Sequence, residues 1–243
     1  MDFNKQAFLR LIASFDTEHL RVTLKNKTVL SYSGGLDSTV LLYKLIAEGD
    51  EVHCLNFHYG SKHNEVERRQ AKKICALNSI PFIDVELPFI DKLFNSDLLK
   101  SGNDLPLGHY TEASMKQTVV PGRNTIMLSI AIGYAESIKA QRIAIANHAD
   151  DHGTYPDTRP EWVASMSLVA YHGTFDHVKL YAPFTHLRKS EICSLGNELQ
   201  VPFGETWTCY AGGKVHCGKC GACSGRKEAF AIAGIADPTT YLV

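Results

Sequence analysis

The chain has 243 residues, of which 44% are hydrophobic and 21% charged, and its formal net charge is −1. This composition excludes a disordered chain, a collagen-like repeat and a small disulfide-stapled scaffold. A chain of this length can bury a core without help, so we expect one large domain or one domain with a small appendage. The near-zero net charge argues against a dedicated nucleic-acid binder, which usually carries a basic surface.

Neither a secretion signal nor a membrane span is expected. Residues 1–15 interrupt their apolar positions with polar ones, and no run approaches about 18 consecutive apolar residues. Cys54, Cys75 and Cys193 are scattered through segments with strand and helix patterns, and we expect them to be buried thiols. Together these features predict a cytoplasmic protein.

Residues 1–27 are expected to form an N-terminal helical extension. Apolar residues from Phe8 to Phe15 recur at helical spacing, which predicts an amphipathic helix over residues 3–16. We expect this helix to pack on the core or on a second subunit, and we expect the chain to form a homodimer.

Residues 28–200 alternate between strand and helix patterns, which predicts an α/β domain with a parallel sheet and right-handed crossovers. The expected strands cover residues 28–32, 51–57, 81–87, 142–146 and 179–181, and the expected helices cover residues 39–47, 65–77, 124–140, 160–171 and 188–199. Residues 90–120 look irregular, and a long loop in a compact domain is usually a lid or a binding loop. Residues 201–243 form a separate C-terminal region that contains clustered cysteines.

A glycine-rich loop follows the first expected strand. It consists of Ser33, Gly34, Gly35, Leu36, Asp37, Ser38 and Thr39. The glycines permit a sharp turn, and the helix behind them offers unpaired N–H groups and the positive end of its dipole. The loop is neither a Walker A motif nor Gly-x-Gly-x-x-Gly. It predicts a phosphate or pyrophosphate site with Mg²⁺ between Asp37 and the phosphate, and the alternative is an ordinary helix N-cap.

Four cysteines, Cys209, Cys217, Cys220 and Cys223, lie close together near the C-terminal end of the sequence. Their spacing, with two Cys-x-x-Cys steps in a glycine-rich segment, is typical of a closed structural zinc site that binds thiolates. Two disulfides are disfavoured by the expected cytoplasmic location, and an iron–sulfur cluster is a further alternative.

The loop and the cysteines together support a resemblance to a known family. Residues 33–39 resemble the pyrophosphate loop of the N-type ATP pyrophosphatases, in the adenine-nucleotide alpha-hydrolase-like superfamily. Residues 120–124, 155–159 and 208–223 are similar to segments of the 7-cyano-7-deazaguanine synthase family. This resemblance covers about residues 28–232 and implies a doubly wound parallel sheet with a small C-terminal zinc-binding region.

The resemblance implies a specific reaction. ATP, with Mg²⁺, adenylates the carboxylate of 7-carboxy-7-deazaguanine, and ammonia then displaces AMP to give an amide. A second adenylation, on the amide oxygen, permits the loss of AMP that yields the nitrile. The implied partners are these small molecules, with no membrane and no stable nucleic-acid partner.

The resemblance also suggests residue roles. Asp37, Arg123 and Lys189 are the expected catalytic residues: Arg123 would hold the substrate carboxylate or a phosphate, and Lys189 would contact a phosphate. The expected substrate-binding residues are Arg123, Tyr155, Asp157, Arg159 and Glu161. A carboxylate of Asp151, Asp157 or Glu161 would accept hydrogen bonds from the guanine-like ring. Tyr155 or Trp207 would stack on the ring.

Two departures from the family pattern fall in the presumed substrate loop. Thr158 stands where many members carry Cys, and residues 147–151 replace a Glu-Thr-Asp run. These departures leave the acceptor open, and the alternative is a relative that transfers the deazaguanine acyl group to an amine on a protein partner. A tRNA-thiolating enzyme is disfavoured by the net charge. A non-catalytic zinc module is disfavoured because a scaffold has no use for a pyrophosphate loop.

Overall fold

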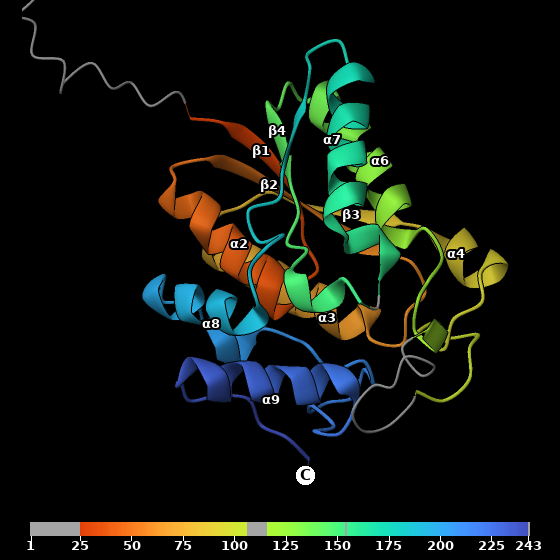
Figure 1. Ribbon diagram of the computed structural model, residues 1–243, viewed down its shortest axis with the longest axis vertical. Coiled ribbons are helices and arrows are strands. Elements are labelled where there is room, and N and C mark those ends of the chain that lie inside the picture. The colour runs from red at the N-terminus through yellow and green to blue at the C-terminus, as the bar shows by residue number, and fades with distance from the viewer. Residues whose placement is uncertain (1–24, 106–115, 154, 243) are drawn as a thin grey trace, which may run out of the picture.

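The structure is a computed structural model that describes residues 25–105, 116–153 and 155–242, so the expected helix over residues 3–16 lies outside it. Its centre is a parallel five-stranded sheet in the order β3-β2-β1-β4-β5 (Figure 1). The strands are β1 (Lys27–Ser31), β2 (Glu51–His58), β3 (Phe82–Glu86), β4 (Arg142–Ala144) and β5 (Lys179–Tyr181). All five agree with the strands expected from the sequence, within two residues at each end.

The helices also follow the expected order, with two additions. They are α2 (Leu36–Ala47), α3 (Asn64–Leu77), α4 (Pro88–Leu93), α6 (Arg123–Ser137), α7 (Pro160–His172), α8 (Lys189–Glu198) and α9 (Gly221–Ala233). Short 3₁₀ turns cover Ala149–Asp151, Pro156–Thr158 and Phe203–Glu205. The sequence did not indicate α4 or α9. It also placed the start of α2 three residues late, because the glycine-rich loop itself supplies the first helical turn.

The helices cover both faces of the sheet. Val29 and Leu30 point to opposite faces, because successive side chains of a strand alternate. The face of Val29 packs against α6 and α7, and the face of Leu30 packs against α2, α3, α8 and α9 (Figure 1). Strands buried on both sides read as apolar runs, which is why the sequence reveals them. The expected doubly wound parallel α/β fold is therefore confirmed.

The C-terminal region packs directly on the α/β core. Phe203 and Phe230 meet edge to face, with ring centroids 4.9 Å apart, in the same cluster as α2 and α8. Gly196 of α8 makes this packing possible, because a Cβ atom there would lie 2.5 Å from Phe203 and 2.7 Å from Val40. Among the described residues, no helix is both long and apolar enough to cross a membrane.

The strand order places a crevice at one edge of the sheet. The chain passes from β1 to β2 on one side, while β4 lies on the other side of β1. In open parallel sheets, ligands bind outside the carboxyl ends of the strands at such a reversal. The loop of residues 33–39 leaves β1 at this point.

At the amino ends of the strands, a buried ion pair is expected to carry much of the local stability. Arg142 Nη2 lies 2.6 Å from Asp50, whose side chain is 2% exposed. Changing Arg142→Met leaves the buried Asp50 carboxylate without its cationic partner. This change should lower the free energy of unfolding by about 3 kcal/mol, measured by urea denaturation. The control Lys139→Met removes an exposed pair with Asp176 and should cost less than about 1 kcal/mol. Equal losses would contradict this account.

Candidate active site

Two adjoining cavities lie at the carboxyl ends of β1 and β4. The first, of about 260 Å³, reaches toward Met127 and Leu128 of α6, and we call it the α6 cavity. The second, of about 540 Å³, lies against α8 and α9, and we call it the α9 cavity. The residues that line both cavities are Ser33, Gly35, Asp37, Glu67, Asp151, Tyr155 and Tyr210. The glycine-rich loop therefore stands between two spaces that open into a common region.

The loop presents its two serines to the cavities. Ser33 Oγ accepts a hydrogen bond from the backbone N–H of Gly35 and lies 3.1 Å from Ser38 Oγ. Thr39 differs, because its buried hydroxyl donates to the carbonyl of Gly35 at 2.7 Å, and it lines neither cavity. The N-terminus of α2 begins here, so the backbone N–H groups and the hydroxyls of Ser33 and Ser38 offer donors to an anion.

Gly34 locks this loop onto a neighbouring helix. Its φ of +82° lies in the left-handed region, and a Cβ atom there would lie 2.8 Å from backbone atoms of Glu67 and Ala71 in α3. From the other side, the backbone N–H of Trp207 donates to the carbonyl of Gly34 at 3.0 Å. Only glycine fits this position, because both the φ angle and the close approach exclude a side chain.

Asp37 is held in the charged form by two basic side chains. Lys189 Nζ lies 3.0 Å from Asp37 Oδ2, and His148 Nε2 lies 3.6 Å from the same oxygen. Burial would raise the pKa of Asp37, but Lys189 and His148 outweigh it and hold the pKa well below its usual range. Lys189, which we expect to contact a phosphate, therefore forms an ion pair with Asp37 in this structure.

The second oxygen of Asp37 fits a metal ion. Asp37 Oδ1 is buried and has no hydrogen-bond partner in the described structure. A buried carboxylate oxygen without a donor is a ligand that Mg²⁺ prefers, and the carboxylate faces both cavities beside the loop. Asp37 could therefore hold Mg²⁺ bound with a nucleotide.

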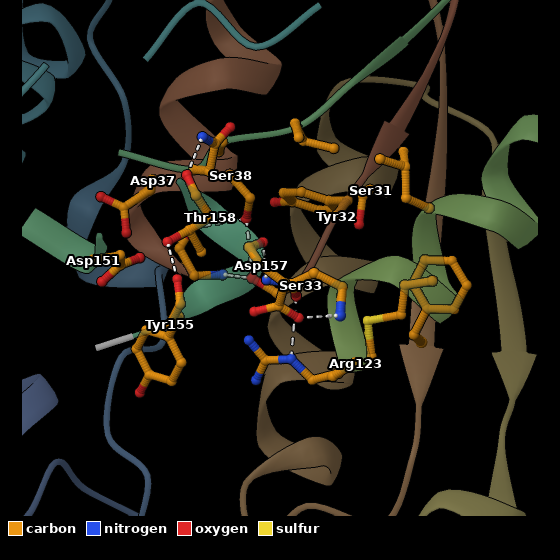
Figure 2. A pocket seen from close by; sticks show the side chains of 18 of the residues that line it. Ser31, Tyr32, Ser33, Asp37, Ser38, Arg123, Asp151, Tyr155, Asp157 and Thr158 are labelled. Carbon is orange, nitrogen blue, oxygen red and sulfur yellow. Dashed lines mark hydrogen bonds between the residues drawn. The ribbon is translucent and has the colours of Figure 1, made fainter. Parts of the chain in front are cut away.

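Arg123, at the start of α6, places its positive charge beside the rings of two tyrosines. Its guanidinium carbon lies 5.7 Å from the ring of Tyr59 and 5.9 Å from the ring of Tyr155, and Nη1 donates to Tyr59 Oη at 3.3 Å. Figure 2 shows Arg123 in the wall of the α6 cavity, near Tyr155 and Asp157. Arg123 forms no ion pair with any carboxylate in the described part of the chain. It could therefore neutralise an anionic ligand.

The four other expected substrate residues separate into two groups. Tyr155 lines both cavities, and Asp157 lines the α6 cavity but accepts the backbone N–H of Asn124 at 2.9 Å, which fixes the start of α6. Arg159 and Glu161 are exposed and line neither cavity. The chain turns into α7 at this point, and the Arg159 Nε group donates to the carbonyl of His152.

The sequence did not indicate several residues that line the α6 cavity, among them Tyr59, His63, Glu67 and Tyr210. The first three follow the carboxyl end of β2, which lies at the same sheet edge as the loop. Their position after a parallel strand was the available signal. Tyr210 follows Cys209 directly, and nothing in its local pattern indicates a cavity.

The four clustered cysteines form the candidate metal centre. Their sulfur atoms all lie within 4.8 Å of one another, and every cysteine is a free thiol. A tetrahedral site with zinc–sulfur bonds of about 2.3 Å needs sulfurs about 3.8 Å apart, so the group fits a metal. The backbone N–H groups of Cys217 and Cys220 donate to the sulfurs of Cys209 and Cys217 at 3.3 Å, which would stabilise thiolates. Among the described residues, no other group of metal-ligating side chains has this geometry, and the polar loop at residues 147–151 does not have it either.

The cysteine region is tied to the phosphate loop by Trp207. The Trp207 Nε1–H donates to the carbonyl of Cys209 at 2.7 Å, and its ring centroid lies 4.1 Å from that of His216. Arg226 of α9 is fully buried, pairs with Asp237 at 3.2 Å, and donates to the carbonyl of Phe203. These contacts fix the segment whose backbone reaches Gly34.

Comparison with known proteins identifies the family. The family model described as queuosine biosynthesis protein QueC matches residues 27–234. The chain belongs to the QueC family. It is 44% identical over 216 residues to the 7-cyano-7-deazaguanine synthase of Desulfotalea psychrophila, and this alignment covers 89% of this chain and 99% of that protein. It is 46% identical over 215 residues to the synthase of the same name from Methanoregula boonei, with 88% and 99% covered.

Among solved structures, the NMN synthetase of Francisella tularensis is 14% identical to this QueC family member, with a TM-score of 0.48 over 97% of this chain and 88% of that one.

The contact of Gly34 with α3 predicts a steric effect. Changing Gly34→Ala should lower the free energy of unfolding by about 2 kcal/mol or more, because both the φ angle and the Cβ contact become strained. It should also weaken ATP binding, measured by calorimetry. The control Gly133→Ala, at a helical site with open space around it, should leave both unchanged or slightly improve stability. Equal behaviour of the two variants would contradict the role of Gly34.

The cysteine geometry predicts a bound metal. Purified protein should contain about one metal ion per chain, and Cys220→Ser should lose it and melt at a lower temperature. Elemental analysis and thermal denaturation measure both effects. Cys75→Ala, which changes a buried thiol outside the cluster, should keep its metal. Retention of metal by Cys220→Ser would exclude this site.

Proposed function

We propose that this protein is an ATP-dependent ligase that converts 7-carboxy-7-deazaguanine and ammonia into 7-cyano-7-deazaguanine, with release of AMP and pyrophosphate. The observation that carries the proposal is the junction of two cavities at the glycine-rich loop, beside the half-buried charges of Asp37 and Arg123. Membership in the QueC family, with relatives named 7-cyano-7-deazaguanine synthase, supports the same substrate.

The α6 cavity suits the nucleoside of ATP. Phe57, Met127 and Leu128 give it apolar walls near the ends of β2 and α6, and such walls accept a flat purine ring. From there the triphosphate would reach the N-terminus of α2, where Ser33, Ser38 and the backbone N–H groups donate to it. Asp37 would hold the Mg²⁺ that neutralises phosphate charge when the nucleotide is bound.

The α9 cavity suits the second substrate. It shares Tyr155 and Tyr210 with the α6 cavity, and their hydroxyl oxygens lie 3.3 Å apart. A planar deazaguanine packed against these rings would bring its carboxylate to the junction, near Arg123. The guanidinium would then balance the negative charges of carboxylate and α-phosphate, which otherwise repel each other.

This arrangement supports the following reaction. A carboxylate oxygen attacks the α-phosphorus of ATP, the bond to pyrophosphate breaks, and an acyl-adenylate forms. The nitrogen of ammonia forms a bond with the acyl carbon, and the carbon–oxygen bond to AMP breaks to give the amide. A second ATP adenylates the amide oxygen, and loss of AMP and N–H protons leaves the nitrile. Lys189 and Arg188, which line the α9 cavity, would stabilise the leaving pyrophosphate.

Several features of the surroundings belong to the same proposal. The four cysteines would hold structural Zn²⁺, because a closed four-sulfur site leaves no position for substrate. Free thiols fit the reducing cytoplasm, where we place the enzyme. We also propose that the enzyme is a homodimer and that its partners are the small molecules ATP, 7-carboxy-7-deazaguanine and ammonia.

A second candidate acceptor follows from the altered loop. Thr158, in the position where many family members carry Cys, is buried and donates its hydroxyl to the carbonyl of Tyr155 at 2.7 Å. This departure from the family pattern leaves the acceptor open, and an amine on a protein partner is the alternative nucleophile. The product distinguishes the two.

One incubation tests the function. The protein with ATP, Mg²⁺, ammonium and 7-carboxy-7-deazaguanine should release AMP and form the nitrile, both read by mass spectrometry. Asp37→Asn should slow AMP release by about 100-fold or more, since it removes the charge that holds the metal and pairs with Lys189. The control Asp176→Asn, at an exposed site outside both cavities, should retain full activity. AMP release without nitrile would favour the protein acceptor.

A further inference from the structure

The carboxyl group of Glu67 lies on the shared wall of the two cavities and has no role in the proposed reaction. Three carboxyl groups line both cavities, namely Asp37, Glu67 and Asp151. Asp37 pairs with Lys189, and Asp151 lies 3.4 Å from His148. Glu67 forms no ion pair with a lysine or arginine within the described ranges. Its nearest basic group is His63 Nε2, at 3.5 Å.

The position of Glu67 is fixed by the same helix that supports the phosphate loop. Glu67 lies on α3, and its backbone carbonyl faces Gly34. Its carboxyl group therefore stands beside the loop, at the junction where the acyl-adenylate would form. The side chain is 15% exposed, so the carboxyl group is largely withdrawn from bulk water while still reaching both cavities.

Three groups from separate elements interact with Glu67. Arg123 approaches from α6, Tyr59 from the end of β2 and His63 from the turn before α3. Tyr210 lines the same two cavities. Burial raises the pKa of Glu67 to about 8, although Arg123 lowers it. A carboxyl group with this pKa can both accept and release a proton near neutral pH.

The proposed reaction needs such a group. In neutral water ammonia is mostly ammonium, which has no free electron pair and cannot attack the acyl carbon. A carboxylate at the junction attracts ammonium by its charge and can then take one of its protons. Asp37 is not free for this task, because its pKa is held low by Lys189 and His148 and it is therefore a weak base.

We propose that Glu67 is the general base that deprotonates the ammonium nucleophile at the junction of the two cavities. This inference rests on the proposed function. A proton moves from ammonium to the Glu67 carboxylate, and the freed ammonia forms the bond to the acyl carbon as the bond to AMP breaks; the amide nitrogen then releases its extra proton to water. After the second adenylation, the nitrogen loses one proton to water, and Glu67 takes the other as the carbon–oxygen bond breaks and the nitrile forms. Each proton then leaves Glu67 for solvent through the α9 cavity.

The test separates proton transfer from adenylation. Hydroxylamine is mostly uncharged at neutral pH, so it captures an acyl-adenylate without prior deprotonation. Glu67→Gln should lower the ammonium-dependent rate of nitrile formation by about 100-fold. It should leave substrate-dependent ATP–pyrophosphate exchange and hydroxamate formation close to wild type. Its ammonium rate should keep rising with pH as free ammonia increases, whereas the wild-type rate should level off above the pKa of Glu67.

Two further variants complete the experiment. Glu65→Gln changes a neighbouring carboxylate of α3 that is 66% exposed and pairs with His58, and it should leave all three rates unchanged. Glu67→Asp keeps a carboxyl group and should recover part of the ammonium rate. An unchanged ammonium rate in Glu67→Gln, or equal losses with ammonium and hydroxylamine, would overturn the role of Glu67. Absence of pyrophosphate exchange in the wild type would instead overturn the proposed function, and this role with it.

Discussion

The close approach of Gly34 to α3 is the contact on which the rest of the site depends. No side chain fits between the loop and the backbone of Glu67 and Ala71, and the N–H of Trp207 holds the loop from the other side. The contact brings the first turn of α2, the cavity face of α3 and the segment leading into the cysteines into one rigid unit. The cysteine region therefore supports the loop, although its sulfur atoms lie in a separate hydrophobic cluster.

Within this unit, the buried charges are divided between structure and ligand. Arg142 with Asp50 and Arg226 with Asp237 are paired, and they stabilise the fold away from the cavities. Arg123 has no carboxylate partner among the described residues, so a bound anion would supply the missing charge. Burying an unpaired charge is costly, and a protein retains such a group where a ligand compensates it. The charge distribution thus favours an anionic substrate at the junction.

The sequence predicted the sheet well because its strands are buried on both faces and appear as apolar runs flanked by helical periodicity. It missed α4, which is only Pro88–Leu93, and α9, whose small residues and cysteines give no clear apolar period. It predicted the loop of residues 33–39 and the four cysteines, because both are local patterns whose chemistry depends on short spacing. Arg159 and Glu161, which it indicated as substrate-binding residues, are exposed at the turn into α7 and line neither cavity, and their role stays a prediction.

The sequence by itself therefore determined the fold class, and it predicted the strand–loop–helix motif and a cysteine cluster that could bind a metal. All three follow from neighbouring residues. Only the tertiary structure decided which side chains share the cavities. Tyr59 and Glu67 follow β2, whereas Tyr210 comes from the distant cysteine region. They meet because parallel strands bring their carboxyl ends to one edge and Gly34 lets α3 approach. Whether a carboxylate is paired or free depends on those long-range contacts, which no local pattern specifies.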